Sequence, residues 1–234
     1  VPFELPVPDR SAIRRILFDQ LGIVLAGTPD ELFDRTYWSN VYYDGVDHFI
    51  RTPRDVVRLT NSMSVTYPAV IGEVNPSDFL AIETLRVFCP VAYDFLRKNT
   101  ESFAGHTELI GGPVGDESTR GYHESWMKQI ADEDKGPVKK LLIRIFPKFE
   151  TVWENVHYPA GWELKWRRER RVCSPDVFHV FFRLGVPEGD ISNAEMRAIV
   201  SLVGDCNAFA AKLVGLASKK RPDGTTRARV FLDR

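Results

Sequence analysis

The chain has 234 residues, of which 44% are hydrophobic and 12% aromatic. This supply of apolar side chains suits one large folded domain or two small ones, and it excludes a disordered tail. Lys and Arg number 31 against 32 Asp and Glu, so the net charge is −1. The balance excludes a global field that would attract nucleic acid or an anionic membrane, and any such partner must use a local patch.

Three cysteines, Cys89, Cys173 and Cys206, lie far apart among apolar neighbours. Their odd number and wide spacing predict neither a disulfide framework nor a zinc site, and a reducing cytoplasm fits this usage best. No apolar run approaches the roughly 20 residues that cross a bilayer. We therefore expect a cytoplasmic location and no membrane attachment through this segment.

Both ends of the sequence look cut. The chain begins at Val1 without a methionine, and it ends at Arg234 where an amphipathic pattern has only just started. We expect it to be a piece of a longer protein.

The first residues carry three prolines in "VPFELPVP", which favours an extended strap. After Asp9 apolar residues recur at helical spacing, Asp9 or Ser11 can cap the start of that helix, and Gly27 is placed to end it. Further helical patterns lie on both sides of a glycine-rich loop at 105–119. They cover 75–90, 91–99, 122–130, 138–146, 175–184 and 192–217.

One helix-start signal recurs along the chain. "TPDE" at 28–31, "TPRD" at 52–55 and "NPSD" at 75–78 each offer a capping side chain, a proline and a carboxylate two residues after the proline. Proline loses nothing at the first helical position, and the acid can reach back to the cap. "SPDVF" at 174–178 and "SNAE" at 192–195 repeat the idea. Together these signals predict a mostly α fold, a helical bundle with an N-terminal strap and at most a short hairpin at 153–172.

The sequence offers almost nothing as a self-contained enzyme. It lacks the loop G-x-x-x-x-G-K-[ST] that cradles phosphates, and the glycine-rich "GGPVGDESTRG" has no lysine. "HESWM" at 123–127 lacks the second histidine of a helical zinc site. We expect no metal site and no catalytic residue in this chain.

A basic, tryptophan-bearing stretch at 162–171 is a candidate nucleic-acid patch, because its cations could grip phosphates while its indoles stack on bases. Its members are Trp166, Arg167, Arg168, Arg170 and Arg171. The alternative, which we favour, is a solvated basic edge whose tryptophans anchor it to the core.

Arg54 poses a separate question, because it directly follows Pro53 in the first turn of a predicted helix. A positive side chain there opposes the helix dipole by roughly 0.3–1 kcal/mol. An ion pair with Asp55 or with another helix would explain it as a structural residue. Alternatively, Arg54 faces an anion supplied from elsewhere, a role that suits the permanent charge and forked donors of arginine.

Three stretches resemble the KAP family of P-loop NTPases. They read "FIRTPRDVVRLTNSM" from Phe49, "VNPSDFLAIETLRVFCPVAYDFLRKN" from Val74 and "RRVCSPDVFHVFFRLGVPEGDISNAEM" from Arg170. The opening "VPFELPVPDRSAIRRIL" is similar to the segment that follows the last core strand in that family. The similarity runs in order through most of residues 1–203.

The resemblance implies that the chain is the C-terminal helical part of an ATPase whose nucleotide-binding core, with its sites for ATP and Mg²⁺, lies upstream. Residues 1–103 would form a lid-like region and residues 104–234 a C-terminal helical region. Arg54 matches a lid arginine that senses the γ-phosphate, with Arg58 and Asn61 as neighbouring candidates.

The family resemblance also suggests antiphage defence, with the upstream core, a protein partner or an oligomer as binding partners. A helical scaffold that binds protein or nucleic acid is the alternative function.

Overall fold

The computed structural model describes residues 9–105, 117–154, 156, 158–159, 161–186, 189–221 and 224–233. The predicted mostly α fold is confirmed. The chain divides into two compact units, residues 1–182 and residues 183–234. The boundary expected between residues 103 and 104 stays a prediction, and the strap and most of the glycine-rich loop lie outside the described residues.

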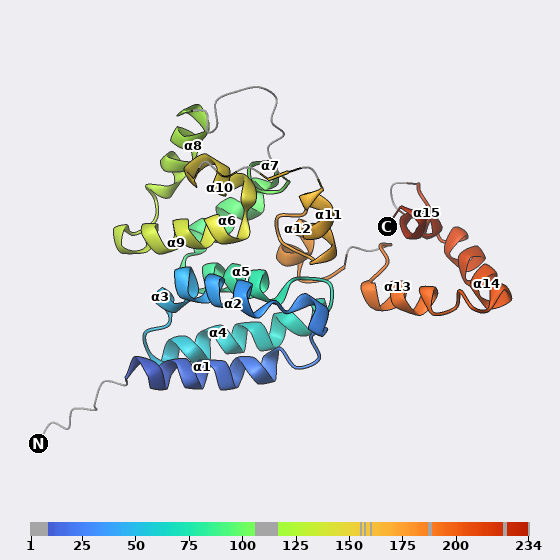
Figure 1. Cartoon of the computed structure of the whole chain (residues 1–234), viewed down its shortest axis with the longest axis horizontal. Coiled ribbons are helices and arrows are strands. Elements are labelled where there is room, and N and C mark those ends of the chain that lie inside the picture. Colours follow the sequence, from blue (N-terminus) through green and yellow to red (C-terminus); the bar gives the residue numbers. More distant parts are fainter. Residues whose placement is uncertain are drawn as a thin grey trace, which may run out of the picture. The chain divides into compact units, whose positions relative to one another are not determined.

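In the first unit, α1 (Arg10–Val24), α4 (Pro53–Thr66) and α5 (Pro76–Phe88) pack in succession (Figure 1). Of the two residues predicted to cap α1, Asp9 does so, accepting from the Ser11 amide at 3.2 Å. The core-facing side chains of α1 recur every four residues, so they form one buried stripe. They are Ile13, Leu17 and Leu21.

The "TPDE" signal does not start a regular helix, so that prediction is wrong. It leads only into a short 3-10 turn, η1 (Asp30–Leu32). The Thr28 hydroxyl donates to the Leu25 carbonyl at 2.7 Å and lies 2.7 Å from the Tyr67 hydroxyl. These bonds compete with capping, because the hydroxyl already has other partners.

Three short elements connect η1 to α4: α2 (Arg35–Val41), the π-helix η2 (Tyr42–Val46) and α3 (Asp47–Phe49). Gly45 lets η2 approach a neighbouring helix closely, since a Cβ there would lie 2.6 Å from the Leu141 Cβ. Only glycine fits this contact without a shift.

Asp47 ties the start of α1 to the segment that leads into α4. Its carboxylate accepts from Arg10 and Arg14, each through Nη2 at 2.7 Å, and from the Tyr42 hydroxyl at 2.8 Å. The bonds from Arg14 and Tyr42 and the charges of both arginines outweigh burial and lower the pKa of Asp47 to about 2. Arg10 also donates to the Ile50 carbonyl at 3.4 Å, so α1 begins beside that segment.

A second group of helices surrounds an aromatic core. It consists of α6 (Pro90–Lys98), α7 (Thr100–Phe103), α8 (Glu117–Met127), α9 (Asp132–Ile145) and α10 (Pro147–Glu154). The Phe103 ring centroid lies 5.1 Å from that of Phe146 and 6.0 Å from that of Phe149. His123 packs edge-on against Phe149, with ring centroids 4.8 Å apart.

The hairpin expected at 153–172 is wrong for the described residues, which contain no strand there and form the helix α11 (Trp162–Arg168) instead. Tyr158, Trp162 and Trp166 follow one another at four-residue spacing and pack together, with ring centroids 5.1–6.2 Å apart. That spacing is helical, and the surrounding charges had obscured it. The helix α12 (Pro175–Arg183) follows.

The second unit contains α13 (Asn193–Val200), α14 (Cys206–Ala217) and α15 (Arg227–Leu232). The single helix expected over 192–217 is interrupted, because Asp205 caps a new start by accepting from the Ala208 amide at 3.0 Å. A small apolar core holds this unit together. Its fully buried members are Ile191, Ile199 and Leu216.

Among the described residues of both units, every helix is too short or too polar to cross a membrane.

Candidate functional site

The start of α4 is closed by the predicted capping box. The Thr52 hydroxyl accepts from the Asp55 amide at 3.2 Å, and the Asp55 carboxylate accepts from the Thr52 amide at 2.9 Å. These reciprocal bonds satisfy amide donors that a helix start otherwise leaves open. The first turn of α4 is therefore fixed by its own residues.

Arg54 lies exposed in that first turn. Among the described residues, its side chain has no hydrogen bond, ion pair or ring contact. The adjacent carboxylate of Asp55 is engaged with the cap instead. The charge of Arg54 is thus held at a fixed helix start and left open to solvent.

The two neighbouring candidates differ from Arg54 and from each other. Arg58 donates through Nη2 to the Val87 carbonyl at 3.0 Å, and its guanidinium lies 4.9 Å from the centroid of the Phe88 ring. Asn61 has an exposed side chain and lies seven residues after Arg54, on the same face of α4. The structure therefore places Arg54 and Asn61 on one open face, while Arg58 ties α4 to the end of α5.

The five members of the candidate nucleic-acid patch do not share one surface. Trp166 is 2% exposed and Arg171 is 8% exposed, so both point into the protein. Arg167 pairs with Asp176 at 3.0 Å. Arg168 is exposed, and Arg170 is half-buried.

Arg171 belongs to a buried polar cluster. Its Nε donates to Asp78 at 2.8 Å, and its Nη2 donates to the Tyr37 hydroxyl at 2.5 Å and to the Arg144 carbonyl at 3.1 Å. The Tyr37 hydroxyl in turn donates to Asp78. Burial raises the pKa of Tyr37 well above its usual range, so the phenol keeps its proton.

This cluster corrects the role predicted for Asp78. The carboxylate does not reach back to the cap at Asn75; it accepts from Arg171 and from the Val172 amide at 2.7 Å. Asn75 caps α5 alone, accepting from the Ser77 amide at 3.0 Å and the Asp78 amide at 3.3 Å.

A cavity of about 600 Å³ lies beside this cluster, lined by residues between Glu31 and Arg171. Sequence reasoning missed it, because its walls come from segments far apart in the chain. The four-residue spacing of Tyr158, Trp162 and Trp166 was the one available signal, since it places three aromatic rings together.

The described part of the chain is a helical protein with one open, arginine-bearing helix start and one enclosed ion-pair cluster. Residues 1–70 match the model described as the KAP family P-loop domain, which confirms the resemblance to that family. The match ends with η3 (Tyr67–Val70), directly after α4, and so includes Arg54, Arg58 and Asn61. No curated protein and no solved structure matches the chain.

Proposed function

We propose that this chain is the helical lid and C-terminal region of a KAP-family P-loop ATPase, in which Arg54 senses the γ-phosphate of a nucleotide held by the upstream core. The observation that carries the proposal is the open guanidinium of Arg54 at a rigid helix start. It lies within the segment that matches the P-loop domain model.

Rigidity of α4 supports this role, because a charge that acts on a phosphate works best when it is already in place. The capping box fixes one end of the helix. Two side chains of α4 also bond to α5: Arg58 donates to the Val87 carbonyl, and the Ser62 hydroxyl donates to the buried Glu83 at 2.9 Å. Arg54 is thus mounted on a helix that two other contacts hold against α5.

The path of the chain also supports the proposal. Arg10 at the start of α1 bonds to Asp47 and Ile50, which lie shortly before the capping box at Thr52. The described chain therefore begins, at Asp9, near the end of the unit where α4 starts. A core attached there would have a short route to Arg54.

Arg54 fits a phosphate, since its donors have no competing partner in the described chain. A site for Mg²⁺ within this chain has less support, because among the described residues no three His, Cys, Asp or Glu side chains converge to hold an ion. In this proposal the core provides the ligands for Mg²⁺, and ATP with its metal supplies the phosphoryl group to be transferred. Arg54 contributes positive charge where negative charge develops.

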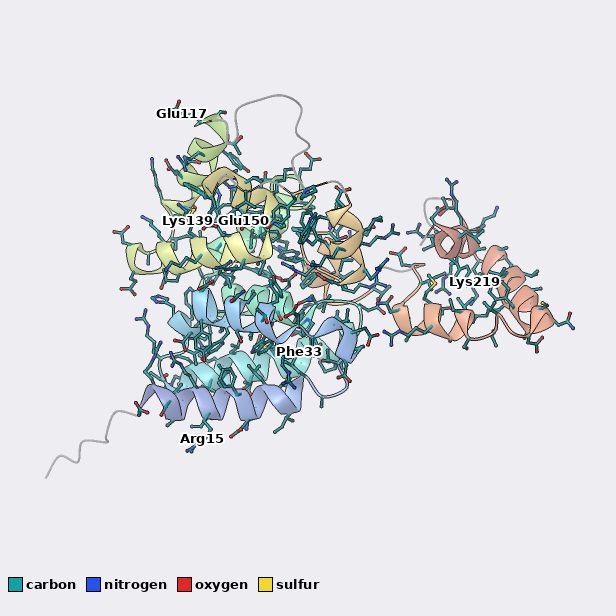
Figure 2. All side chains as sticks on the ribbon, viewed as in Figure 1. Arg15, Phe33, Glu117, Lys139, Glu150 and Lys219 are labelled. Carbon is teal, nitrogen blue, oxygen red and sulfur yellow. The ribbon has the colours of Figure 1, made fainter. Side chains whose placement is uncertain are left out.

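The direct test measures ATP turnover and nucleotide affinity of the protein that includes its core. We expect Arg54→Ala to lower kcat about 100-fold or more, and Arg54→Lys to recover only part of it, since lysine lacks the fork. Arg15→Ala is the matched control, because Arg15 is an exposed arginine on α1 without a partner among the described residues (Figure 2). Turnover and affinity unchanged by Arg54→Ala would refute the sensor role.

Two broader parts of the proposal need their own measurements. The chain alone should neither bind ATP tightly nor hydrolyse it, which equilibrium binding and a turnover assay would check. Antiphage defence would be tested by phage plating on cells that carry the wild-type protein or the Arg54→Ala variant. Equal protection by both would separate defence from nucleotide sensing.

A further inference from the structure

The cavity beside Arg171 has the size of a small-molecule site. Its volume is about 600 Å³, and its walls come from the segment that enters α2, the junction of α9 and α10, and α11. Pockets for small ligands span roughly 300–1,000 Å³. Phe33, ahead of α2, and Glu150, on α10, are two of the lining residues labelled in Figure 2.

One guanidinium nitrogen in the cavity wall is free to bind a ligand. The Arg171 side chain is only 9% exposed, and its Nε and Nη2 are held by Asp78, Tyr37 and the Arg144 carbonyl. The Tyr37 ring adds a face contact, with its centroid 3.9 Å from the guanidinium carbon. Nη1 has no hydrogen-bond partner among the described residues, so it is a rigidly positioned donor beside the cavity.

Three aromatic rings, tilted against one another, line one side of the cavity, and the half-buried Trp162 is the ring whose face a planar ligand can reach. Tyr158, Trp162 and Trp166 all line the cavity. The ring centroids of Tyr158 and Trp162 are 5.3 Å apart, and those of Trp162 and Trp166 are 6.2 Å apart. Such rings stack on planar heterocycles.

Glu150 supplies an acceptor in the same cavity. One of its oxygens accepts from the Tyr158 hydroxyl, and the other has no partner among the described residues. Burial raises the pKa of Glu150, and the hydrogen bond from Tyr158 and the charges of Arg144 and Arg171 only partly offset it. A ligand N–H would satisfy the remaining oxygen.

The charges of the lining favour a neutral ligand. Four acidic and four basic side chains surround the cavity among the described residues, so it has no excess of either sign. Asp78, behind Arg171, adds a further negative charge. An anion would find no net attraction, whereas a neutral ring that carries both donor and acceptor groups could bond to the basic and to the acidic side chains.

We propose that this cavity binds a guanine-type nucleobase or nucleoside, stacked on the ring of Trp162. Arg171 donates through Nη1 to the carbonyl oxygen of the ring, and Glu150 accepts from the adjacent ring N–H. Guanine carries a carbonyl acceptor where adenine carries an amino donor, so Arg171 selects against adenine. This proposal is independent of the role of Arg54.

Lys165 is the group that the ring must displace. Its ammonium lies 4.4 Å from the Trp162 ring centroid, yet its side chain is 54% exposed and its contact with Glu169 is long, at 3.8 Å. Exposed pairs of this kind contribute little stability. Lys165→Ala should therefore bind the ring at least as tightly as the wild type.

The test titrates the chain with guanosine and with adenosine, and it follows tryptophan fluorescence and the heat of binding. We expect saturable guanosine binding below about 1 mM and adenosine binding at least about tenfold weaker, because a mismatched donor leaves Arg171 unpaired. Absent guanosine binding, or equal affinity for both nucleosides, would overturn the proposal.

Variants then locate the ligand. Glu150→Met and Trp162→Leu should each weaken guanosine binding about tenfold or more, while Glu154→Met, an exposed acid on the same helix α10, should leave it unchanged. Circular dichroism confirms that each variant is folded. Unchanged affinity in both cavity variants, or loss of guanosine binding in Lys165→Ala, would overturn the proposed position of the base.

Discussion

Helices α4 and α5 begin with the same pattern of cap, proline and carboxylate, yet their carboxylates have opposite surroundings. Asp55 closes a capping box at the protein surface. Asp78 is fully buried and bonds to Arg171, 93 residues further along the chain. The local pattern sets where each helix starts, and the packing of distant elements decides what the carboxylate does.

Position in the fold explains the difference. The first turns of α5 are covered on all sides, so every residue from Pro76 to Leu85 is buried. α4 keeps one open face, on which Val57 is 53% and Val65 is 79% exposed. A buried carboxylate needs a charged partner to offset its desolvation, whereas a surface carboxylate needs only the local amides.

The largest expected effect is on the buried member of this pair. Asp78→Ala should lower the free energy of unfolding by about 3–5 kcal/mol, because it leaves Arg171 buried without its counter-charge. Urea denaturation measures the loss. Asp55→Ala should cost only about 1 kcal/mol, the usual size of a cap.

Equal losses for the two aspartates would contradict this account. The double variant Asp78→Leu with Arg171→Met is the control, since replacing both charges with apolar groups should recover part of the stability. No recovery would mean that the Tyr37 hydroxyl and the Val172 amide, rather than Arg171, account for the loss.

Sequence reasoning found what is local and missed what is long-range. The caps at Thr52, Asn75 and Ser192 follow from neighbouring residues and were predicted correctly, and Asp9 is one of the two residues predicted to cap α1. The pairing of Asp78 with Arg171 could not be predicted, because no pattern links residues 93 positions apart. Arg171 was grouped with exposed arginines for the same reason: its sequence neighbours are basic, but its burial comes from α2, α5 and α9.

The candidate site shows the same limit. Arg54 was singled out because its charge opposes the helix dipole, which is a local property. That Arg58 would instead bond to the Val87 carbonyl depends on the contact between α4 and α5. The cavity and its aromatic wall required the full packing of the first unit.

A buried histidine sharpens the comparison, because it shows how burial alone, without an ion pair, affects stability. His123 is 1% exposed, and its Nδ1 accepts from the Trp126 indole at 3.2 Å. Burial lowers the pKa of His123 to about 4. The unfolded chain therefore binds the proton first, and stability should fall as pH drops from about 6.5 towards 4, by up to about 3 kcal/mol.

Unfolding free energies measured between pH 7 and pH 5 check this effect, before most carboxylates titrate. His123→Leu should be less stable at neutral pH, yet its stability should depend less on pH in this range. A slope that is unchanged in the variant would assign the pH dependence to another group.

The caps themselves should differ by a smaller amount. Thr52→Ala should cost about 1 kcal/mol, since it removes one bond to the Asp55 amide. Asn75→Ala should cost about 2 kcal/mol, because the side-chain amide of Asn75 also donates to the carbonyls of Leu32 and Glu169, at 3.3 and 3.2 Å. Thermal unfolding of the two variants compares them, and a larger loss for Thr52→Ala would reverse the expected order.

The smallest effect is expected at Arg54. Arg54→Ala should change the free energy of unfolding by less than about 0.5 kcal/mol, and the sign should be stabilising, because it removes a positive charge from the first turn of α4. Arg58→Ala is the contrast, since it loses the bond to the Val87 carbonyl and the contact with Phe88 and should destabilise. If Arg54 adds nothing to folding but is needed for ATP turnover of the protein with its core, its position at the helix start serves phosphate sensing. A clear loss of stability in Arg54→Ala would instead make it a structural residue.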